Sequence, residues 1–334
     1  MSPLLIILIV LAIGFDFLNG VHDSSNIVAT MISSRAIRPR MALTMTAIAE
    51  FCGPFIFGVA VANTIGNEIV ASEHLNMLVI IAALVSAIVW NIVTWMLGIP
   101  SSSSHALIGG IIGAVVVGAG FQEIQMAGVI KVLISLFISP VIGFFAGMII
   151  ATLVYKLSWK ATPKINGVFK KLQVITSFGL ALSHGTNDAQ KTMGIITLGL
   201  VISGVQKEFA VPFWVIVICA AAIALGTSVG GWQLIRTLGS KFYKIRPVHG
   251  FASQITSATV ILTASLFGGP VSTTQVVSTA IMGVGAAERM SKVRWGVAGE
   301  IASAWLFTIP STALLAAGIY CLISSGIPAL IKLF

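Results

Sequence analysis

The sequence is poor in charged residues. Only 9% of its 334 residues are Asp, Glu, Lys or Arg, whereas about a quarter of a soluble domain is charged. Hydrophobic residues make up 57% of the chain, and the mean hydropathy is +1.03. A chain of this composition cannot cover itself with polar surface in water. The composition therefore excludes a soluble globular protein and predicts a protein embedded in a lipid bilayer.

Cysteine is also scarce, and common nucleotide and metal motifs are missing. The three cysteines (Cys52, Cys219 and Cys321) lie far apart in apolar runs without metal-binding spacing, so we interpret them as small core residues. There is no Gly-x-x-x-x-Gly-Lys-Ser/Thr loop, which argues against ATP as an energy source, and no His-Glu-x-x-His metalloprotease pattern. The N-terminus lacks the basic start of a signal peptide, so we expect it to be retained as the first span.

What the sequence does contain is ten long apolar segments, which predict an all-α polytopic membrane protein. A membrane-spanning helix needs roughly 20 apolar residues. Some segments are longer than one bilayer thickness and contain a glycine or a polar break, so they can count as two half-helices. The segments cover 3–33, 41–63, 75–97, 101–119, 125–157, 172–202, 210–235, 250–267, 271–287 and 295–325.

Two polar motifs each occur twice, in the same order, inside apolar segments. The first runs Asn19-Gly20-Val21-His22-Asp23 and returns 165 residues later as His184-Gly185-Thr186-Asn187-Asp188. The second runs Pro100-Ser101-Ser102-Ser103-Ser104-His105 and returns 170 residues later as Pro270-Val271-Ser272-Thr273-Thr274-Gln275. We therefore predict two copies, 1–157 and 172–334, joined by a cytoplasmic basic linker at 158–171. This organisation is typical of secondary transporters.

Basic residues predict the orientation of the two copies. Lys and Arg collect in cytoplasmic loops, which explains the net charge of +9 without nucleic acid as a partner. Four basic clusters are separated by even numbers of segments, so all four can lie in the cytoplasm. Each copy then has five segments, which predicts inverted-topology repeats with both termini outside, unless 101–119 and 271–287 are re-entrant. The clusters are Arg35/Arg38/Arg40, Lys156/Lys160/Lys164/Lys170/Lys171, Arg236/Lys241/Lys244/Arg246 and Arg289/Lys292/Arg294.

The first motif places a carboxylate inside an apolar segment of each copy. Such a carboxylate costs at least about 2.5–3.5 kcal/mol and is normally functional, with helix packing or capping as the alternative role. Gly20 and Gly185 are expected to let the helices unwind. Carbonyl, carboxylate and amide oxygens together suit a hard monovalent cation such as Na⁺. His22 and His184 are expected to orient these groups or to handle protons. The expected Na⁺ ligands are Asp23, Asn26, Asn187 and Asp188.

The second motif places a row of hydroxyl groups between a proline and an apolar helical run. This order is a helix start signal, and a helix N-terminus binds anions through its free N–H groups and positive dipole end. Ordinary N-capping is the alternative, but it needs only one Ser or Thr. In inverted repeats, two such termini would approach one anion from opposite sides. The expected anion ligands are Ser101, Ser102, Ser103, Ser104, Ser272, Thr273, Thr274 and Gln275.

The two motifs favour opposite charges, and this opposition suggests coupling. Two carboxylates repel a multivalent oxyanion strongly in a low dielectric, but bound cations turn that repulsion into attraction. The site then fills well only when cation and anion arrive together. We expect Lys191 either to pair with Asp188 or to contact the anion. Glu50 is expected to be a gating or proton-linked group or a packing contact, and Asp16 and Glu300 have the same alternatives.

At these motifs the chain resembles the inorganic phosphate transporter (PiT) family of sodium- or proton-coupled phosphate symporters. The stretches 19–26 and 183–191 are similar to its paired Gly-x-[Asn/His]-Asp signatures, and the two hydroxyl stretches are similar to its Pro-[Ile/Val]-Ser-x-Thr-His signatures. The resemblance covers nearly the whole chain. It implies phosphate as the anion, an inverted-repeat fold of about twelve helices counting broken ones, and a homodimer.

The chain departs from the family pattern at three positions. Gln275 stands where the signature often has His, and Lys191 stands where animal-type members often have Asn. Gln254 occupies a place where some members carry an acid. The lack of that acid favours Na⁺ over H⁺ as the coupling ion. The chain also lacks the long central cytoplasmic loop of larger members.

The sequence therefore predicts a multi-pass plasma-membrane symporter that imports inorganic phosphate with Na⁺ at a midplane site between the repeats. Its predicted partners are phosphate, Na⁺ and the lipid bilayer, with no other cofactor. Coupling to H⁺, transport of a metal–phosphate complex, and sulfate transport by the same fold are alternatives. A Ser-His-Asp hydrolase is disfavoured because Ser104 and His105 are adjacent, so their side chains point about 100° apart on a helix.

Overall fold

The computed structural model describes residues 2–70, 75–99, 101–240 and 243–331, and its regular elements in those ranges are helical. Short 3₁₀ or π segments lie between some of the α-helices. The α-helices in the described chain are α1 (Pro3–Ser33), α2 (Pro39–Phe57), α3 (Ala60–Asn63), α4 (Met77–Leu97), α5 (Ser103–Gly118), α6 (Met126–Leu157), α7 (Ile165–Ile202), α8 (Phe213–Val229), α9 (Trp232–Ser240), α10 (Pro247–Leu266), α11 (Thr273–Glu288) and α12 (Trp295–Ile331).

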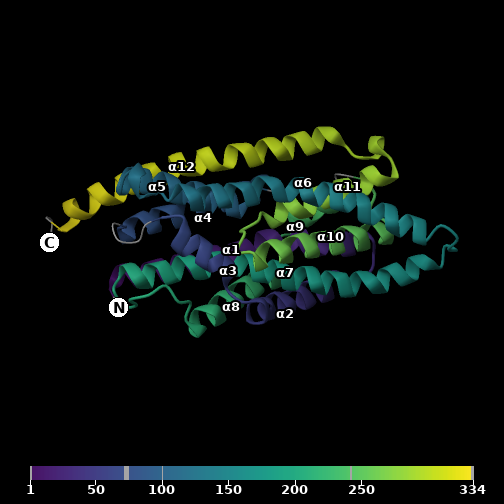
Figure 1. Cartoon of the computed structure of the whole chain (residues 1–334), viewed down its shortest axis with the longest axis horizontal. Coiled ribbons are helices and arrows are strands. Elements are labelled where there is room, and N and C mark those ends of the chain that lie inside the picture. The colour runs from purple at the N-terminus through teal and green to yellow at the C-terminus, as the bar shows by residue number, and fades with distance from the viewer. Residues whose placement is uncertain (1, 71–74, 100, 241–242, 332–334) are drawn as a thin grey trace.

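The long helices lie roughly side by side along one axis of the molecule (Figure 1). Helix α1 starts and α12 ends at the same end of that axis, and the connection between α6 and α7 lies at the opposite end (Figure 1). Among the described residues, four helices are long and apolar enough to cross a bilayer, namely α1, α4, α6 and the Ala298–Ser325 part of α12. A fifth candidate is α2 together with Ala60–Glu68, which are bent by 74°. The chain is therefore a multi-pass membrane protein, and ten full spans stay a prediction.

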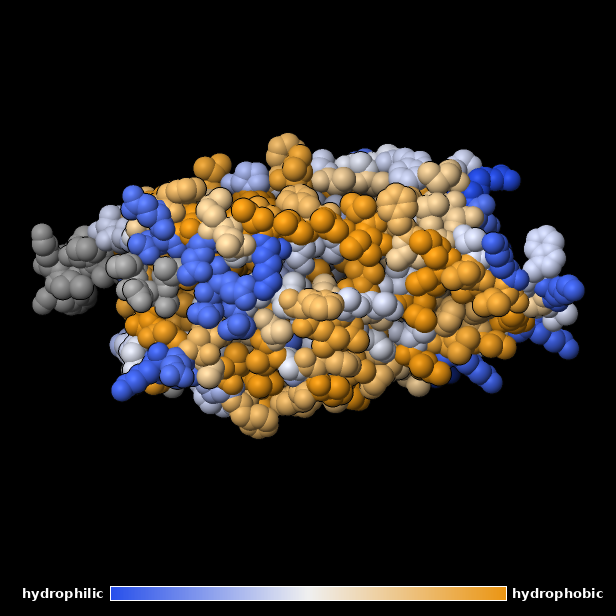
Figure 2. Space-filling view, in the orientation of Figure 1, coloured by the Kyte–Doolittle hydropathy of each residue, from blue (hydrophilic) through white to orange (hydrophobic). Residues whose placement is uncertain are grey.

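The outer surface is that of a protein surrounded by lipid. Helix α6 exposes large apolar side chains at helical spacing, including Ile134, Phe137, Val141 and Phe145. Hydrophobic residues cover much of the middle of the molecule, and hydrophilic residues gather toward its two ends (Figure 2). Exposing such an apolar helix face to water is unfavourable, so lipid or another apolar surface must cover it.

The structure corrects the prediction that Gly20 and Gly185 unwind their helices. Both α1 and α7 continue through these positions without a break. A Cβ on Gly20 would overlap the carbonyl oxygen of Ile223 on α8, and a Cβ on Gly185 would overlap that of Glu50 on α2. The two glycines are therefore required because two helix backbones approach each other closely, and not because the helix opens.

The partner helices carry matching glycines. Gly226 on α8 lies against the carbonyl oxygen of Phe17 on α1, and Gly53 on α2 lies against that of Leu182 on α7. Helix α1 thus packs on α8 in the same way as α7 packs on α2, with glycine on both sides of each crossing. The two crossings hold the parts of α1 and α7 that carry the first motif.

The helix breaks occur at other glycines. Gly98 (φ 67°) and Gly268 (φ 71°) turn the chain after α4 and α10 and before the hydroxyl motifs. Gly58 (φ 83°) and Gly230 (φ 77°) separate α2 from α3 and α8 from α9. Positive φ values favour glycine, which has no Cβ. The helix breaks predicted from the sequence are therefore found at these glycines. Pro100 lies outside the described residues.

The basic segment at 158–171 is only partly a loop. Helix α6 ends at Leu157 and α7 begins at Ile165, so the second half of this segment forms the first turns of α7. Lys160 and Lys164 are exposed, as expected for a solvated connection. The division of the chain into two copies at this point stays a prediction.

Candidate functional site

The centre of the bundle brings both carboxylates of the first motif against the start of α11. The hydroxyl of Thr273 lies within hydrogen-bond distance of Asp188 Oδ2 (3.1 Å) and Asp23 Oδ2 (3.4 Å), and its single proton is shared between the two carboxylates. Ligand atoms of Asp23, His184 and Asp188 lie within 4.8 Å of one another. Residues far apart in the sequence therefore share one buried site, as the repetition of the motifs predicted.

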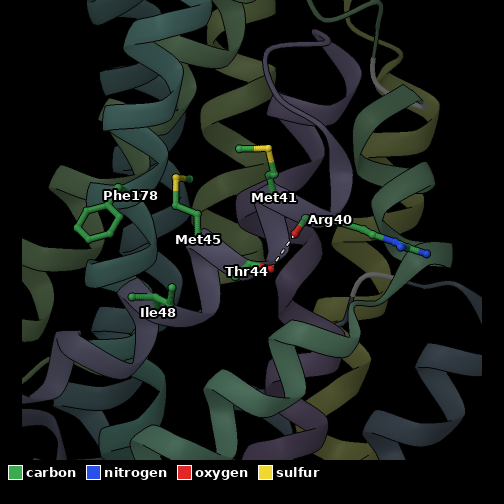
Figure 3. A pocket seen from close by; sticks show the side chains of 6 residues that line it. All are labelled: Arg40, Met41, Thr44, Met45, Ile48 and Phe178. Carbon is green, nitrogen blue, oxygen red and sulfur yellow. Dashed lines mark hydrogen bonds between the residues drawn. The ribbon is translucent and has the colours of Figure 1, made fainter.

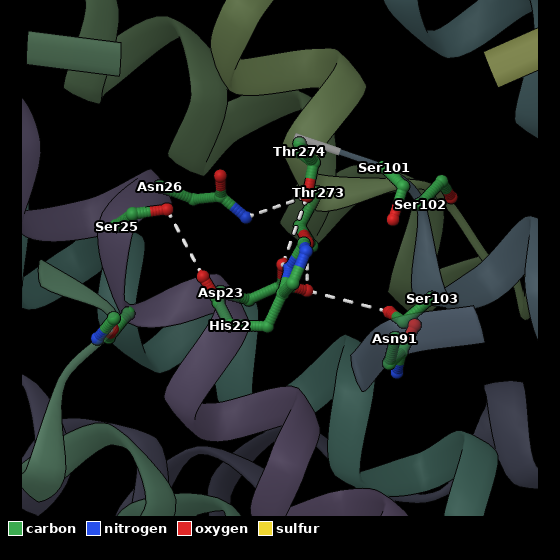
Figure 4. A network of polar contacts seen from close by, with 12 residues as sticks. His22, Asp23, Ser25, Asn26, Asn91, Ser101, Ser102, Ser103, Thr273 and Thr274 are labelled. Carbon is green, nitrogen blue, oxygen red and sulfur yellow. Dashed lines mark hydrogen bonds and ion pairs between the residues drawn. The ribbon is translucent and has the colours of Figure 1, made fainter. Parts of the chain in front are cut away.

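Asp23 is surrounded by hydroxyl groups from both hydroxyl motifs (Figure 4). Thr274 donates to its Oδ1 at 3.0 Å, and Ser103 donates to its Oδ2 at 3.5 Å. His22 Nδ1 lies 2.8 Å from Oδ1. Asn26 donates from Nδ2 to the Thr274 hydroxyl at 3.0 Å, while its Oδ1 has no hydrogen-bond partner in the described chain. An amide oxygen is therefore left available beside the carboxylate.

Asp188 has a different environment, because Lys191 forms an ion pair with it. His184 Nε2 lies 2.9 Å from Asp188 Oδ2, and His184 Nδ1 lies 2.8 Å from Glu50 Oε1 on α2. The imidazole thus lies between two buried carboxylates. Glu50 joins the central cluster through this contact.

Lys191 is 1% exposed and connects α7 to both hydroxyl motifs. Besides pairing with Asp188, its ammonium group donates to Ser104 Oγ at 2.6 Å and to the carbonyl oxygen of Val271 at 3.1 Å. The sequence left open whether Lys191 pairs with Asp188 or faces the anion site. In the structure it contacts Asp188 and also reaches the hydroxyl motif.

One residue of each hydroxyl motif serves as an ordinary N-cap. Ser102 accepts the backbone N–H of His105 (3.2 Å), and Ser272 accepts that of Gln275 (3.4 Å). Ser101 instead lies 2.7 Å from the Thr94 hydroxyl of α4. The remaining hydroxyls face the carboxylates and the lysine. They belong to Ser103, Ser104, Thr273 and Thr274.

The amide of Asn187 is engaged with the chain that leads into α11. Its Nδ2 donates to Ser265 Oγ (2.8 Å) and the Gly269 carbonyl (3.4 Å), and its Oδ1 accepts the N–H of Val271 (3.3 Å). These bonds hold the segment before the helix in place. A second lone pair on Oδ1 is still available to a cation.

Asn91 on α4 is a candidate that the sequence reasoning missed. It is 2% exposed and its side-chain atoms have no hydrogen-bond partner in the described chain. Its backbone carbonyl oxygen lies 3.3 Å from the hydroxyl of Thr94, which in turn lies 2.7 Å from the Ser101 hydroxyl of the first hydroxyl motif, and Figure 4 draws Asn91 in the same polar network. The available signal was a single amide inside the otherwise apolar segment 75–97. An amide buried without a partner is costly, and α4 packs on α5, which carries the first hydroxyl motif, so Asn91 is a candidate for the site.

The charges in this cluster do not balance. Three carboxylates and one lysine lie together with exposures of 1% or less, namely Asp23, Asp188, Glu50 and Lys191. An uncompensated buried charge costs several kcal/mol. The cluster is therefore stable only with additional positive charge, which a bound cation or a proton supplies.

The Ser-His-Asp arrangement of a hydrolase is not formed here. His105 Nδ1 lies 2.7 Å from Ser102 Oγ, but its other ring nitrogen faces Gln275 Nε2 at 3.4 Å. A catalytic triad places a carboxylate on that side of the ring. The neighbouring Ser104 hydroxyl contacts Lys191 and Val271 and not His105.

A surface recess of about 400 Å³ lies away from this cluster, on α2 beside α7 (Figure 3). Its wall is mostly apolar, and the Arg40 guanidinium points away at one side (Figure 3). Neither repeated motif contributes to it, so it is not the candidate site. The lining residues are Arg40, Met41, Thr44, Met45, Ile48 and Phe178.

Comparison with known proteins identifies a family that matches most of the chain. The family described as "Phosphate transporter family" matches residues 19–316. The chain is 47% identical over 320 residues to a "Probable low-affinity inorganic phosphate transporter" of Rhizobium meliloti (strain 1021), covering 95% of this chain and 96% of the relative. A protein of the same description from Bacillus subtilis (strain 168) is 43% identical over 326 residues, covering 96% and 97%.

A solved structure described as "The sodium-dependent phosphate transporter" has the same fold. It superposes with a TM-score of 0.87 at 25% sequence identity, over 97% of this chain and 99% of the other. The family match covers both repeated motifs, and its relatives are transporters and not enzymes. The chain therefore belongs to the phosphate transporter family.

Proposed function

We propose that this protein is a secondary symporter that imports inorganic phosphate together with Na⁺. The observation that carries the proposal is the position of Thr273, whose hydroxyl lies within hydrogen-bond distance of both Asp23 and Asp188 at the start of α11. An anion at that helix start lies directly beside two carboxylates. Binding is favourable only if a cation reduces the repulsion between them. The similar solved structure is that of a sodium-dependent transporter, which supports Na⁺ as that cation.

The contacts suggest a division of roles within the site. We propose that Asp23, Asn26 and Asp188 hold the cation, with Asn187 Oδ1 as a further ligand. Phosphate is proposed to bind the hydroxyls of the two helix starts, assisted by Lys191. Four residues are proposed mainly to hold those helix starts in position, because the bonds of three of them are made within or between the motif segments and Ser101 bonds to Thr94 of α4. They are Ser101, Ser102, Ser272 and Gln275.

The proposed site lies between two inverted repeats. The matched glycine crossings of α1 with α8 and of α7 with α2 support this organisation, because each first helix of one copy packs on the second helix of the other. We propose a plasma-membrane location with both termini outside. The homodimer implied by the family resemblance stays a prediction.

Proton coupling is a second candidate, and a specific contact favours it. His184 lies 2.8 Å from Glu50 and 2.9 Å from Asp188, so a proton could pass from one carboxylate to the other through the imidazole. The Asp23, His184 and Asp188 group also offers donors to a divalent metal that accompanies phosphate.

Uptake of radiolabelled phosphate into proteoliposomes tests the proposal. A Na⁺ gradient and a proton gradient are imposed separately, with sulfate as a competitor. We expect the Na⁺ gradient to drive accumulation, the proton gradient alone to have little effect, and sulfate to compete weakly. Accumulation driven by protons in the absence of Na⁺ would establish the second candidate instead. Liposomes without protein are the control, and the phosphate that enters them by passive leakage is subtracted from the measured uptake.

A further inference from the structure

A basic recess lies at the end of the molecule that holds the α6–α7 connection, away from the central cluster. Helices α1 and α12 run along the bundle in opposite directions (Figure 1), so the end of α1 and the start of α12 both lie at this end. The recess has a volume of about 580 Å³. Half of the described residues that line it are basic, and none of them is acidic. The lining residues are Ser33, Ser34, Arg35, Lys244, Ile245, Arg246, Pro247 and Arg294.

The basic groups of this recess come from three separate parts of the chain. Arg35 follows α1, and Arg294 directly precedes α12. Lys244 and Arg246 lie just before α10. The preference of Lys and Arg for cytoplasmic loops explains why basic residues gather at one end of the molecule. It does not require three distant loops to place them around one recess, so their convergence favours an anionic ligand.

The acidic residue beside this recess does not neutralise it. Glu288 forms an ion pair with Arg246 but also with Lys292. One carboxylate is therefore shared between two cations, and the group as a whole keeps an excess of positive charge.

Arg35 has a backbone conformation that glycine adopts more easily. Its φ of 55° is the one positive value among the non-glycine residues of the described chain. The N–H of Arg35 donates to the carbonyl oxygen of Ile32, and the N–H of Ala36 donates to that of Met31. Helices commonly end in this way at a glycine. An arginine here costs conformational energy, and a role for its side chain in the recess explains why the chain carries it.

The basic recess continues into apolar recesses on the lipid-facing side of α2. Arg35 also lines a second recess of about 610 Å³, formed by the α1–α2 connection and the start of α2. Met41 lines this second recess and also the apolar recess on α2 beside α7 (Figure 3). Met41 and Ile48 are 58% and 57% exposed. Three recesses thus follow one another, from four basic groups at the end of the bundle to an apolar surface that lipid must cover.

We propose that these recesses bind one anionic phospholipid, with its phosphate headgroup in the basic recess and an acyl chain along the apolar recesses. Arginine and lysine form charge-assisted hydrogen bonds with phosphate oxygens. The apolar recesses offer contacts that an acyl chain uses and a free phosphate ion does not, which favours a lipid over inorganic phosphate. The proposed orientation places this end in the cytoplasm, where the membrane leaflet is negatively charged and basic pockets between helices suit anionic headgroups.

The lipid connects segments that are far apart in the sequence. Its headgroup contacts the end of α1 together with the segments before α10 and α12, so binding holds these three segments together. A ligand that binds only the folded protein raises the unfolding temperature. The recesses contain no residue of the central cluster, so this binding goes beyond the proposed transport function and does not depend on the transported ions.

Native mass spectrometry of the purified full-length protein in detergent, with added phosphatidylglycerol, tests this site. Phosphatidylcholine with the same acyl chains is the lipid control, because its headgroup carries no net charge. We expect phosphatidylglycerol to bind about tenfold more tightly or better and to raise the unfolding temperature more than phosphatidylcholine does. Each basic group removed from the recess should weaken phosphatidylglycerol binding by about fivefold.

The variants separate the headgroup contacts from the acyl-chain contacts. Arg35→Gly removes a basic side chain and should keep the fold, because glycine is favoured at this positive φ. Lys244→Gln removes a second charge, and Lys160→Gln is its matched control. Lys160 is exposed at the same end of the molecule and lines none of the three recesses, so its loss should leave binding unchanged. Ile48→Gln places a polar group in the apolar recess and should weaken lipid binding with all basic groups in place.

Two results would overturn the proposal. The first is equal affinity for the two lipids, or phosphatidylglycerol binding by the folded double variant Arg35→Gly/Lys244→Gln that matches Lys160→Gln. The second is displacement of phosphatidylglycerol by inorganic phosphate together with unchanged lipid binding in Ile48→Gln, which would assign the basic recess to free phosphate. Gel filtration identifies any variant that fails to fold. Phosphate uptake is not the readout, so a failure of the proposed transport function would leave this test intact.

Discussion

Asp23 and Asp188 occupy equivalent positions in the two copies of one motif, yet their surroundings differ in charge. Asp188 is paired with Lys191, whereas the residue equivalent to that lysine in the first motif is Asn26. The helices that carry them pack alike, each against a glycine-bearing partner helix. The two motifs therefore share a backbone arrangement and differ in how the carboxylate is balanced.

This difference indicates separate tasks for the two carboxylates. A carboxylate with its own lysine contributes little net charge and serves mainly to fix the geometry around it. A carboxylate surrounded by hydroxyls, an amide and a histidine has no fixed positive partner, so it gains most from a bound cation. The comparison predicts that removing charge from the two sides will have unequal effects on stability and on Na⁺ dependence.

The largest expected effect on stability comes from removing the lysine. Lys191→Met leaves Asp188 charged and buried without its partner, which should lower the free energy of unfolding by about 3–5 kcal/mol. Thermal unfolding in detergent without Na⁺ measures it. The double variant Lys191→Met/Asp188→Asn is the control and should recover most of the loss. Equal unfolding temperatures for the single variant and the unaltered protein would show that Asp188 does not depend on this lysine.

Asp23→Asn should change the stability of the protein little and its Na⁺-dependent phosphate uptake strongly. The amide keeps the shape of the side chain, and no lysine loses its partner, so the fold should change little in stability. Phosphate uptake should lose its Na⁺ dependence and fall by roughly 10- to 100-fold, because a charge-assisted contact to the cation is lost. Asp188→Asn should also reduce uptake and Na⁺ dependence, but with a stability loss. Normal Na⁺-dependent uptake by Asp23→Asn would reject its role as a cation ligand.

Much of the helical arrangement follows from local properties of the sequence. The predicted segment 3–33 coincides with α1, and 125–157 begins and ends within one residue of α6, because long apolar runs have only one way to satisfy their backbone in lipid. The paired motifs likewise predicted that Asp23, Asp188 and Thr273 belong together. Repetition supplied long-range information that a single motif lacks.

The remaining features depend on contacts between distant segments. The sequence suggested flexibility at Gly20, but only the crossing of α1 with Ile223 on α8 explains that glycine. Asn91 was missed because it occurs once and has no repeated partner. Lys191 contacts Asp188, which is three residues away on the same helix, and Ser104, which lies on a different helix. Spacing along α7 predicts the first contact and cannot predict the second.

Gly20→Ala and Gly185→Ala test whether α1 packs on α8 as closely as α7 packs on α2. The added methyl group would overlap the carbonyl oxygen of Ile223, so α1 and α8 must separate, at a cost of about 1–3 kcal/mol. Gly185→Ala should cost a similar amount at the crossing of α7 with α2. Gly14→Ala is the control, because a Cβ there has no atom within 4 Å and alanine favours a helix. Thermal unfolding that is insensitive to Gly20→Ala and Gly185→Ala would contradict the close helix crossings.

Glu288 at the end of α11 should show the smallest effect, because its ion pairs are partly in water. Arg246 and Lys292 donate to it at 2.5 and 2.6 Å, and His249 Nε2 lies 2.8 Å away. Partial burial raises the pKa of Glu288, but the bonds from Lys292 and His249 and the charge of Arg246 outweigh this and lower the pKa from 4.5 to about 2. The carboxylate itself is 34% exposed, so solvent screens these pairs.

Glu288→Gln should therefore cost at most about 1 kcal/mol at neutral pH, far less than Lys191→Met. Because the folded pKa is depressed, the stabilisation is present above pH 4.5 and is lost as the pH falls toward 2. Unfolding temperatures of the variant and the unaltered protein should differ slightly at neutral pH and converge in acid, and added salt should reduce the difference. A loss as large as that of Lys191→Met would show that burial is not what distinguishes the central ion pair from the peripheral one.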